Sequence, residues 1–269
     1  MELVEWEMRV GVEADAGAVA VVRLNDPARR NALSAQLVAE FIEIVDEVEG
    51  HRDVRSIVIT GAPPSFCAGA DLGSLADEQG RPQGDAEREA GLRRIYAAFL
   101  RVSRCTLPTV AAVNGPAVGA GMNLALACDV RLAARSARFD ARFLELGLHP
   151  GGGHTFLLER AVGEQATRAM VLFGERLDAL EAERRGLVWR CVDDDVLVDE
   201  AVRFASRAAE VPRALLTTTK ETLRRAANLV DHDAAVDLEI VAQTWSLGQP
   251  FFVERLAALR SRISSSKPD

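Results

Sequence analysis

The stretch that most constrains how this chain can fold is residues 112–130, which read AVNGPAVGAGMNLALACDV. An apolar segment runs through a glycine-rich turn into a second apolar segment, and this pattern predicts a strand, a tight turn and a helix. The end of the turn, residues 119–121, carries almost no side chain, so a ligand can approach its backbone closely. The first N–H groups of the helix lack intrahelical partners and lie at its positive end, which suits a phosphate or an oxygen gaining negative charge. The same glycines would also let a helix pack against a strand without any ligand, and the local pattern leaves both interpretations open.

Length, charge and cysteine content narrow the class of protein. A chain of 269 residues suffices for one large domain, or for one domain and a small appendage. The 40 acidic residues against 32 basic ones give a net charge of -8, which argues against nucleic acid as a partner. The four cysteines show no CxxC spacing, so we expect reduced core thiols in a cytoplasmic protein, and neither disulfides nor a metal site. We expect no secretory signal, because glutamates interrupt residues 1–12. We expect no membrane partner, because no apolar run approaches the ~18 residues of a membrane span.

Apolar segments of strand type and helix type alternate along most of the chain, which indicates an α/β fold. The expected strands are residues 4–12, 18–24, 55–60, 109–113, 131–134 and 186–191. Ser34 is expected to cap a helix after the polar loop at residues 25–33. Another helix is expected from about residue 90 to 105, after a polar segment at 73–89 with the profile of a mobile cover over a site.

Successive helical patterns replace this alternation towards the C-terminus. Leu197, Ala201 and Ala205 mark one helical face, and further helices are expected over residues 215–227, 234–247 and 251–263. Helices without a sheet to cover often pack on each other or on another subunit. We therefore divide the chain into a core at residues 1–195 and a C-terminal helical region at 196–269. The last residues, 264–269, are expected to be disordered.

Two further turns of small residues accompany the first. Residues 66–72, FCAGADL, follow the strand at 55–60, and residues 150–153, PGGG, open a helix. Arg29 and Arg30 lie in the polar loop, just ahead of the tripeptide NAL at 31–33. A pair of loop arginines is often only solvated, although it is also suited to hold a phosphate.

Taken together, these segments resemble the crotonase superfamily, also called the enoyl-CoA hydratase/isomerase family. The resemblance runs from Val19 to about Arg262, and it is carried by the NAL, FCAGADL and PGGG segments, the 112–130 stretch and the GLV tripeptide at 186–188. It implies a crotonase-like spiral of ββα units that forms two packed sheets. It also implies C-terminal helices that build homotrimers, often stacked as hexamers.

The resemblance implies an acyl-CoA thioester as ligand, with coenzyme A entering as part of the substrate and no other cofactor. Backbone N–H groups at Ala70 and Ala120 would form an oxyanion hole for the thioester oxygen as an enolate develops. Either Arg29 or Arg30 would meet the CoA phosphates. The residues that would line the pantetheine and adenine are Ala32, Ala68, Asp71 and Leu72. Phe252 and Arg255 match a C-terminal segment that reaches a CoA, although helix packing accounts for Phe252 equally well.

The chain departs from the family at the positions that transfer protons. Where a hydratase of the usual kind has two glutamates, this sequence has Asn123 and Phe143, and an acid often found after the proline of the third turn is replaced by Gly151. None of these residues exchanges a proton at neutral pH. The remaining candidates for catalysis are His149, His154 and Glu145 as acid or base, and Asn123 as a hydrogen-bond donor.

Each of these candidates also has a structural explanation. Turn histidines often form local hydrogen bonds or face solvent, and Asn123 is equally suited to packing. Glu145 follows Phe143 by two residues, so a helix would point it roughly 200° away from that side chain. A surface salt bridge is then the plain interpretation of Glu145.

Three functions follow from these residues. The favoured one is an enoyl-CoA hydratase or isomerase with non-standard acid and base residues. The second is a non-catalytic acyl-CoA binding protein that has kept the ligand site without its acids. The third is an enzyme of the same fold that hydrolyses a thioester or cleaves a C–C bond with histidine as base.

Overall fold

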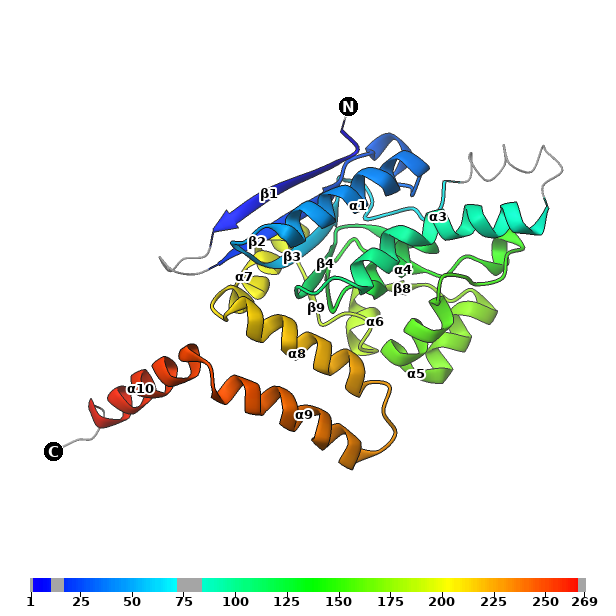
Figure 1. Ribbon diagram of the computed structural model, residues 1–269. Helices are drawn as coiled ribbons and strands as arrows, with labels where there is room; N and C mark the ends of the chain where they lie inside the picture. The colour runs from blue at the N-terminus through cyan, green and yellow to red at the C-terminus, as the bar shows by residue number, and fades with distance from the viewer. Residues whose placement is uncertain (1, 11–16, 72–83, 266–269) are drawn as a thin grey trace. The chain divides into compact units, whose positions relative to one another are not determined.

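Among the described residues, six strands form the larger of two sheets, in the order β1-β2-β3-β4-β6-β9 (Figure 1). The computed structural model describes residues 2–10, 17–71 and 84–265. β1 pairs antiparallel with β2, and the later pairs in this sheet are parallel. The strands are β1 (Val4–Val10), β2 (Ala18–Leu24), β3 (Val54–Gly61), β4 (Thr109–Val113), β6 (Val130–Ala134) and β9 (Arg190–Val192). The expected α/β fold and the antiparallel pair at the start of the chain are confirmed.

Helices cover both faces of the larger sheet. Along β2, Val19 and Val21 belong to the cluster that packs against α7 (Leu197–Ala209). Ala20 and Val22 belong to the other cluster, which includes the buried residues of α1 (Ala35–Gly50). Successive side chains of a strand point to opposite faces, so β2 is buried on both sides. This double burial explains why β2 reads as a continuous apolar run.

The second sheet has three short strands in the order β5-β7-β8. They are β5 (Pro116–Val118), β7 (Arg138–Asp140) and β8 (Leu177–Asp178). An isolated bridge between Cys67 and Ala117 ties β5 to the segment that follows β3. None of these strands was predicted, because two or three residues carry too little alternation to be recognised.

The other helices of this part of the chain are α3 (Asp85–Ser103), α4 (Ala120–Ala127), α5 (His154–Phe173) and α6 (Ala179–Arg184). Ser34 caps α1 as expected, since its Oγ accepts a hydrogen bond from the Leu37 N–H at 3.2 Å. The segment at 73–89 was expected to be a mobile cover. Residues 72–83 lie outside the described residues, and residues 85–89 are the first turn of α3, so the expectation is wrong for them.

The chain divides into two units, Met1–Glu210 and Val211–Asp269. The division falls after Glu210 rather than near Asp195, because α7 packs its buried Leu197, Ala201 and Ala205 on the larger sheet. The second unit contains α8 (Arg213–Ala226), α9 (His232–Leu247) and α10 (Pro250–Ser265). The C-terminal helices are thus as expected, although α10 runs on through residues 264 and 265, which were expected to be disordered.

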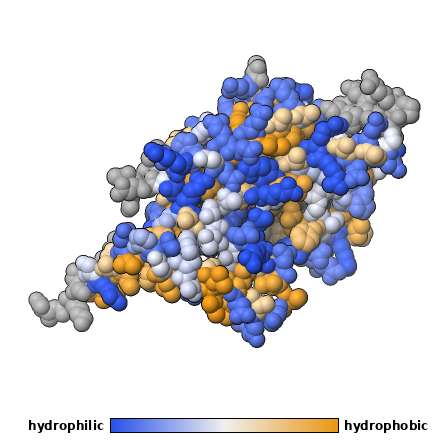
Figure 2. Space-filling view, viewed as in Figure 1, coloured by the Kyte–Doolittle hydropathy of each residue, from blue (hydrophilic) through white to orange (hydrophobic). Residues whose placement is uncertain are grey.

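Apolar side chains gather on the surface of α9, where Figure 2 shows a hydrophobic patch. The residues that are exposed there include Val236, Ile240, Val241 and Leu247. A face of this kind is typical of a surface that binds another protein chain. Among the described residues, no helix is sufficiently long and apolar to span a membrane.

Two local expectations near the site are corrected. The strand expected at 186–191 begins only at Arg190, because Gly186 has a φ of +77° and closes the turn after α6. Phe143 and Glu145 were expected on a helix. Phe143 instead precedes a single 3-10 turn, Leu144–Leu146, which ends at Gly147 with a φ of +69°.

Candidate functional site

Asn31 fixes the loop that carries the two arginines. Asn31 is fully buried, and its backbone lies in the left-handed region with a φ of +57°. Oδ1 accepts from the Asp26 N–H at 2.9 Å, and Nδ2 donates to the Ala62 and Ser65 carbonyls at 2.8 and 2.7 Å. These hydrogen bonds hold the loop against the segment after β3, so Arg30 lies beside Ala68, whose N–H donates to the Arg30 carbonyl at 3.0 Å.

The segments that carry Ala70 and Ala120 are adjacent. Cys67 exchanges backbone hydrogen bonds with β5, through the Pro116 carbonyl at 3.2 Å and the Val118 N–H at 3.1 Å. A Cβ at Gly121 would collide with the Cys67 carbonyl, so only glycine lets α4 start this close to the other turn. A Cβ at Gly69, which has a φ of +100°, would come within 3.6 Å of the Ala120 nitrogen. The two turns thus meet where the sequence predicted their donors.

The N–H groups of Ala70 and Ala120 have no acceptor among the described residues. In the bridge between Leu33 and Ala70, it is the Leu33 N–H that donates, to the Gly69 carbonyl at 2.7 Å. Ala120 is the first residue of α4, and the first N–H groups of a helix have no intrahelical partner. Both predicted donors, on neighbouring segments, are therefore unpaired within the part of the chain that the structure describes.

The two candidate arginines differ in their surroundings. Arg29 donates from Nε to the buried carboxylate of Asp26 at 2.7 Å. Arg30 is exposed and forms no ion pair with any described residue. Of the two, Arg30 has the guanidinium that is available to an anion.

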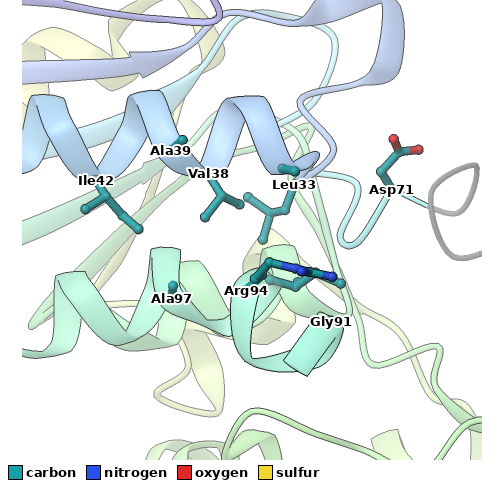
Figure 3. Close-up of a pocket in the computed structure, with 10 residues that line it drawn as sticks. Leu33, Val38, Ala39, Ile42, Asp71, Gly91, Arg94 and Ala97 are labelled. Atoms are coloured by element: carbon teal, nitrogen blue, oxygen red, sulfur yellow. The ribbon is translucent and has the colours of Figure 1, made fainter. Parts of the chain in front are cut away.

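An apolar cleft of about 280 Å³ lies between α1 and α3. Figure 3 shows Leu33, Val38 and Ile42 on one wall, Ala97 on the other, and Asp71 at one end. Asp71 directly follows the donor Ala70, so the cleft ends beside the predicted oxyanion site. Ala32, the neighbour of Leu33, is buried, and Ala68 is half-buried.

Asn123 and His154 form a buried pair next to the third turn. Asn123 Nδ2 donates to the Gly151 carbonyl at 2.9 Å, and Asn123 Oδ1 lies 2.7 Å from His154 Nδ1. Both side chains are 1% exposed. The Phe143 ring meets the imidazole edge to face, with the ring centroids 5.0 Å apart. His154, one of the two candidate histidines, thus contacts both Asn123 and Phe143.

Burial lowers the pKa of His154 from 6.5 to about 4. Removing an imidazolium from water is unfavourable when no carboxylate accompanies it, so the neutral ring is favoured. Its Nε2 is buried and has no hydrogen-bond partner among the described residues. A buried nitrogen without a partner is unusual, since buried polar atoms are nearly always hydrogen-bonded.

The other two acid or base candidates lie at the surface. His149 is exposed, and its Nδ1 donates to the Pro150 carbonyl at 2.7 Å. Glu145 is 46% exposed and pairs with Arg176 at 2.8 Å. The local hydrogen bond and the salt bridge that were considered for these residues are both present.

Tyr96 of α3 is a site residue that the sequence reasoning missed. Burial raises the pKa of its phenol above the usual value, and the Gly152 backbone near the hydroxyl oxygen partly offsets that effect. A Cβ at Gly151 would collide with this oxygen, so the tyrosine occupies the space in which a side chain at that position would begin. The available signal was that this is the chain's single tyrosine, on a helix whose apolar face would otherwise hold aliphatic residues.

The remaining expected ligand residues are less defined. Leu72 lies outside the described residues. Phe252 and Arg255 lie on α10 of the second unit, and their contact with CoA stays a prediction. Among the described residues, no three His, Cys, Asp or Glu side chains are grouped so that they could hold a metal ion.

Comparison with known proteins places this geometry in a family. The family model for enoyl-CoA hydratase/isomerase matches residues 14–249. A probable enoyl-CoA hydratase of Mycobacterium tuberculosis is 47% identical over 91% of this chain and 94% of its own length. The 1,2-epoxyphenylacetyl-CoA isomerase of Escherichia coli is 36% identical over 82% of this chain and 84% of its own length.

Solved structures agree with this result. The enoyl-CoA hydratase of Bacillus anthracis matches with a TM-score of 0.86 and 27% identity, over 97% of this chain and 96% of that one. An enoyl-CoA hydratase subunit of Geobacillus kaustophilus matches with a TM-score of 0.84 and 33% identity, over 100% of this chain and 98% of its own. The chain belongs to the enoyl-CoA hydratase/isomerase family and has the crotonase fold.

Proposed function

We propose that this protein is an acyl-CoA enzyme that stabilises a thioester enolate in an oxyanion hole, and that it acts as an enoyl-CoA hydratase or isomerase. The observation that carries the proposal is the pair of available N–H groups at Ala70 and Ala120, on segments locked together by the Cys67 hydrogen bonds to β5. Relatives named as enoyl-CoA hydratase and as an acyl-CoA isomerase support it.

The chemistry requires this kind of site. When a nucleophile adds to an enoyl thioester, or when a proton leaves its α-carbon, the electron pair moves to the thioester oxygen. Two fixed donors stabilise that charge more than they stabilise the neutral carbonyl, so they accelerate the reaction. The loss of one such donor costs about 3–4 kcal/mol of transition-state stabilisation.

The residues around the donors indicate where the other parts of the acyl-CoA bind. We place the CoA phosphates at Arg30, because Arg29 already pairs with Asp26. Ala32 and Ala68 have side chains small enough to admit the pantetheine beside the loop. The cleft between α1 and α3 (Figure 3) takes the apolar part of the ligand, since it is lined by aliphatic side chains and ends at Asp71.

Proton transfer in this enzyme differs from that of a usual hydratase. We infer that the two glutamate positions of the family are held here by Asn123 and Phe143, and that the position after the third turn's proline is Gly151. None of the three transfers a proton, so the acid and base come from another side chain.

The substitution Ala120→Pro tests the oxyanion hole, because proline has no backbone N–H to donate. Ala120 is the first residue of α4, a helix position that suits proline, but Gly119 before it has a φ of +52° and a ψ of −114°, so circular dichroism checks that the variant is folded. We expect turnover of a series of 2-enoyl-CoA thioesters, followed by loss of their conjugated absorbance, to fall roughly 100- to 1000-fold. Ala179→Pro, the same change at the first residue of α6, is the control and keeps its activity.

Mass spectrometry of the products separates the reaction types: added water, a moved double bond, or free CoA. Free CoA as the product would replace the hydratase proposal by the thioester hydrolase. A non-catalytic acyl-CoA binding protein is favoured by the absence of acids at Asn123, Phe143 and Gly151. That alternative replaces the enzyme if wild-type protein binds the thioesters but leaves them unchanged at every chain length.

A further inference from the structure

The imidazole of His154 contacts both positions at which the family resemblance places a glutamate. It is hydrogen-bonded to Asn123 and packs edge to face on Phe143. We propose that His154 is the single acid and base of this enzyme, with Nε2 accepting a proton and returning it, and that Asn123 is a positioning residue that fixes the ring. This inference rests on the proposed function, because it supplies the proton transfer that the oxyanion hole alone lacks.

The hydrogen bonds of Asn123 define which nitrogen of His154 carries the proton. Nδ2 of Asn123 must be the donor towards the Gly151 carbonyl, because a carbonyl only accepts. Oδ1 is therefore the atom that faces His154, and it also only accepts. Nδ1 of the neutral imidazole must carry the hydrogen, which leaves the lone pair on Nε2.

His154 is connected to the predicted oxyanion hole through Asn123, which lies on the same helix as Ala120. Asn123 lies three residues after Ala120 on α4, so the two residues share one face of the helix, one turn apart. Phe143 approaches the same turn, with its Cζ 3.9 Å from the position that a Cβ of Gly119 would take. Asn123, which is hydrogen-bonded to His154, is thus one helical turn from the donor that would carry the thioester oxygen.

The third turn holds His154 in place from two sides. The Gly151 carbonyl accepts from Asn123, and the Tyr96 hydroxyl fills the space in which a side chain at Gly151 would begin. His154 is the first residue of α5, where a side chain leans back towards the preceding turn. A ring supported in this way keeps its orientation without a carboxylate partner.

The buried Nε2 of His154 lacks a hydrogen-bond donor among the described residues, which a ligand or a water molecule would supply. A buried acceptor without a partner is unfavourable, and a donor brought by the substrate removes that cost. The nitrogen has no exposed surface, so the acyl group reaches it when a neighbour moves aside. The half-buried Phe143 ring is one such neighbour, since it packs edge to face on the imidazole.

Hydration then needs only one base. Nε2 takes a proton from water as the water oxygen bonds to the β-carbon, and the electrons of the double bond move to the thioester oxygen, which Ala70 and Ala120 hold. The imidazolium next gives its proton to the α-carbon, and the carbonyl re-forms. Isomerisation uses the same atoms, since Nε2 removes a proton from the α-carbon of a 3-enoyl thioester and returns it at the γ-carbon.

The test compares wild-type enzyme with His154→Gln and His154→Ala. We expect kcat to fall roughly 100- to 10,000-fold, the usual contribution of general acid–base catalysis, while calorimetry shows thioester binding retained. Added imidazole should restore part of the activity of His154→Ala, which a structural role alone would not produce. His232→Gln, a change at an exposed histidine of the second unit, should keep full activity.

Nitrogen NMR of the wild-type histidines gives a readout that needs no variant to fold. We expect His154 to show a protonated Nδ1 and a bare Nε2, and we expect Asn123→Leu to change that tautomer ratio and lower kcat more than it changes KM. Full activity of folded His154→Gln, or a proton on Nε2 in the wild type, overturns the inference alone. A wild type that binds thioesters without any turnover or α-proton exchange overturns the proposed function, and this inference with it.

Discussion

Neutral His154 makes the stability of the first unit depend on pH. The fold lowers the pKa of this histidine from 6.5 to about 4, and each pKa unit corresponds to about 1.4 kcal/mol. The unfolded chain therefore binds a proton more readily than the folded chain between these two pH values. Stability is complete above pH 6.5, falls as the pH drops, and is about 3 kcal/mol lower near pH 4.

The window between pH 7 and pH 5 isolates this histidine, with an expected loss of about 2 kcal/mol. The carboxylates whose pKa the fold lowers, among them Glu49 and Asp194, start from 4.5 and 3.8, so they titrate below this window. Glu49 is partly desolvated, and the Thr106 and Arg101 hydrogen bonds outweigh that effect. The assay is urea unfolding followed by circular dichroism at a series of pH values and one protein concentration.

Removal of the titrating ring should flatten this profile. We expect His154→Gln to show little change in the free energy of unfolding between pH 7 and pH 5. His149→Gln is the matched control, because His149 is exposed in the same turn, and it should keep the wild-type slope. Equal slopes for wild type and His154→Gln would refute the reasoning that burial holds this imidazole neutral.

Three further predictions concern the ligand and the assembly. Arg30→Gln should weaken binding of a CoA thioester roughly 10- to 100-fold in calorimetry, leave binding of a short thioester without phosphates unchanged, and exceed the effect of Arg29→Gln; equal effects would remove Arg30 from the site. Ile42→Trp should fill the cleft. The roughly fourfold gain in kcat/KM per methylene added to the acyl chain should then stop at a shorter chain than in the wild type. If kcat/KM depends on chain length as in the wild type, the acyl chain lies elsewhere. Light scattering should find the wild type as a homotrimer or hexamer and Val241→Glu as a smaller species, since Val241 is 72% exposed on the apolar face of α9; a monomeric wild type would contradict this expectation.

The sequence predicted those parts of the site that depend on the local backbone. The turns at Ala70 and Ala120 were recognisable because small residues follow an apolar strand. Neither N–H has an acceptor among the described residues, and their role in an oxyanion hole stays a prediction. The loop at Asn31 was recognised as polar. Its hydrogen bonds to Ala62 and Ser65 were not foreseen, because they join residues more than 30 positions apart.

Proton transfer could not be read from the sequence for the same reason. His154 and Asn123 are 31 positions apart, and only the fold brings the imidazole to the amide. The pairing of Glu145 with Arg176 is likewise a tertiary contact. Tyr96 was overlooked because its helix reads as an ordinary packed helix until the third turn is seen against it.

Exchange of the α-protons of a saturated acyl-CoA thioester in deuterated water tests the central claim most directly. The exchange requires an enolate held by Ala70 and Ala120 and a base at the α-carbon, and it does not depend on which reaction the enzyme completes. We predict that wild-type protein introduces deuterium at the α-carbon, and that Ala120→Pro and His154→Gln each lose this activity while still binding the thioester. A wild type that binds the thioester and leaves its α-protons in place would contradict the account.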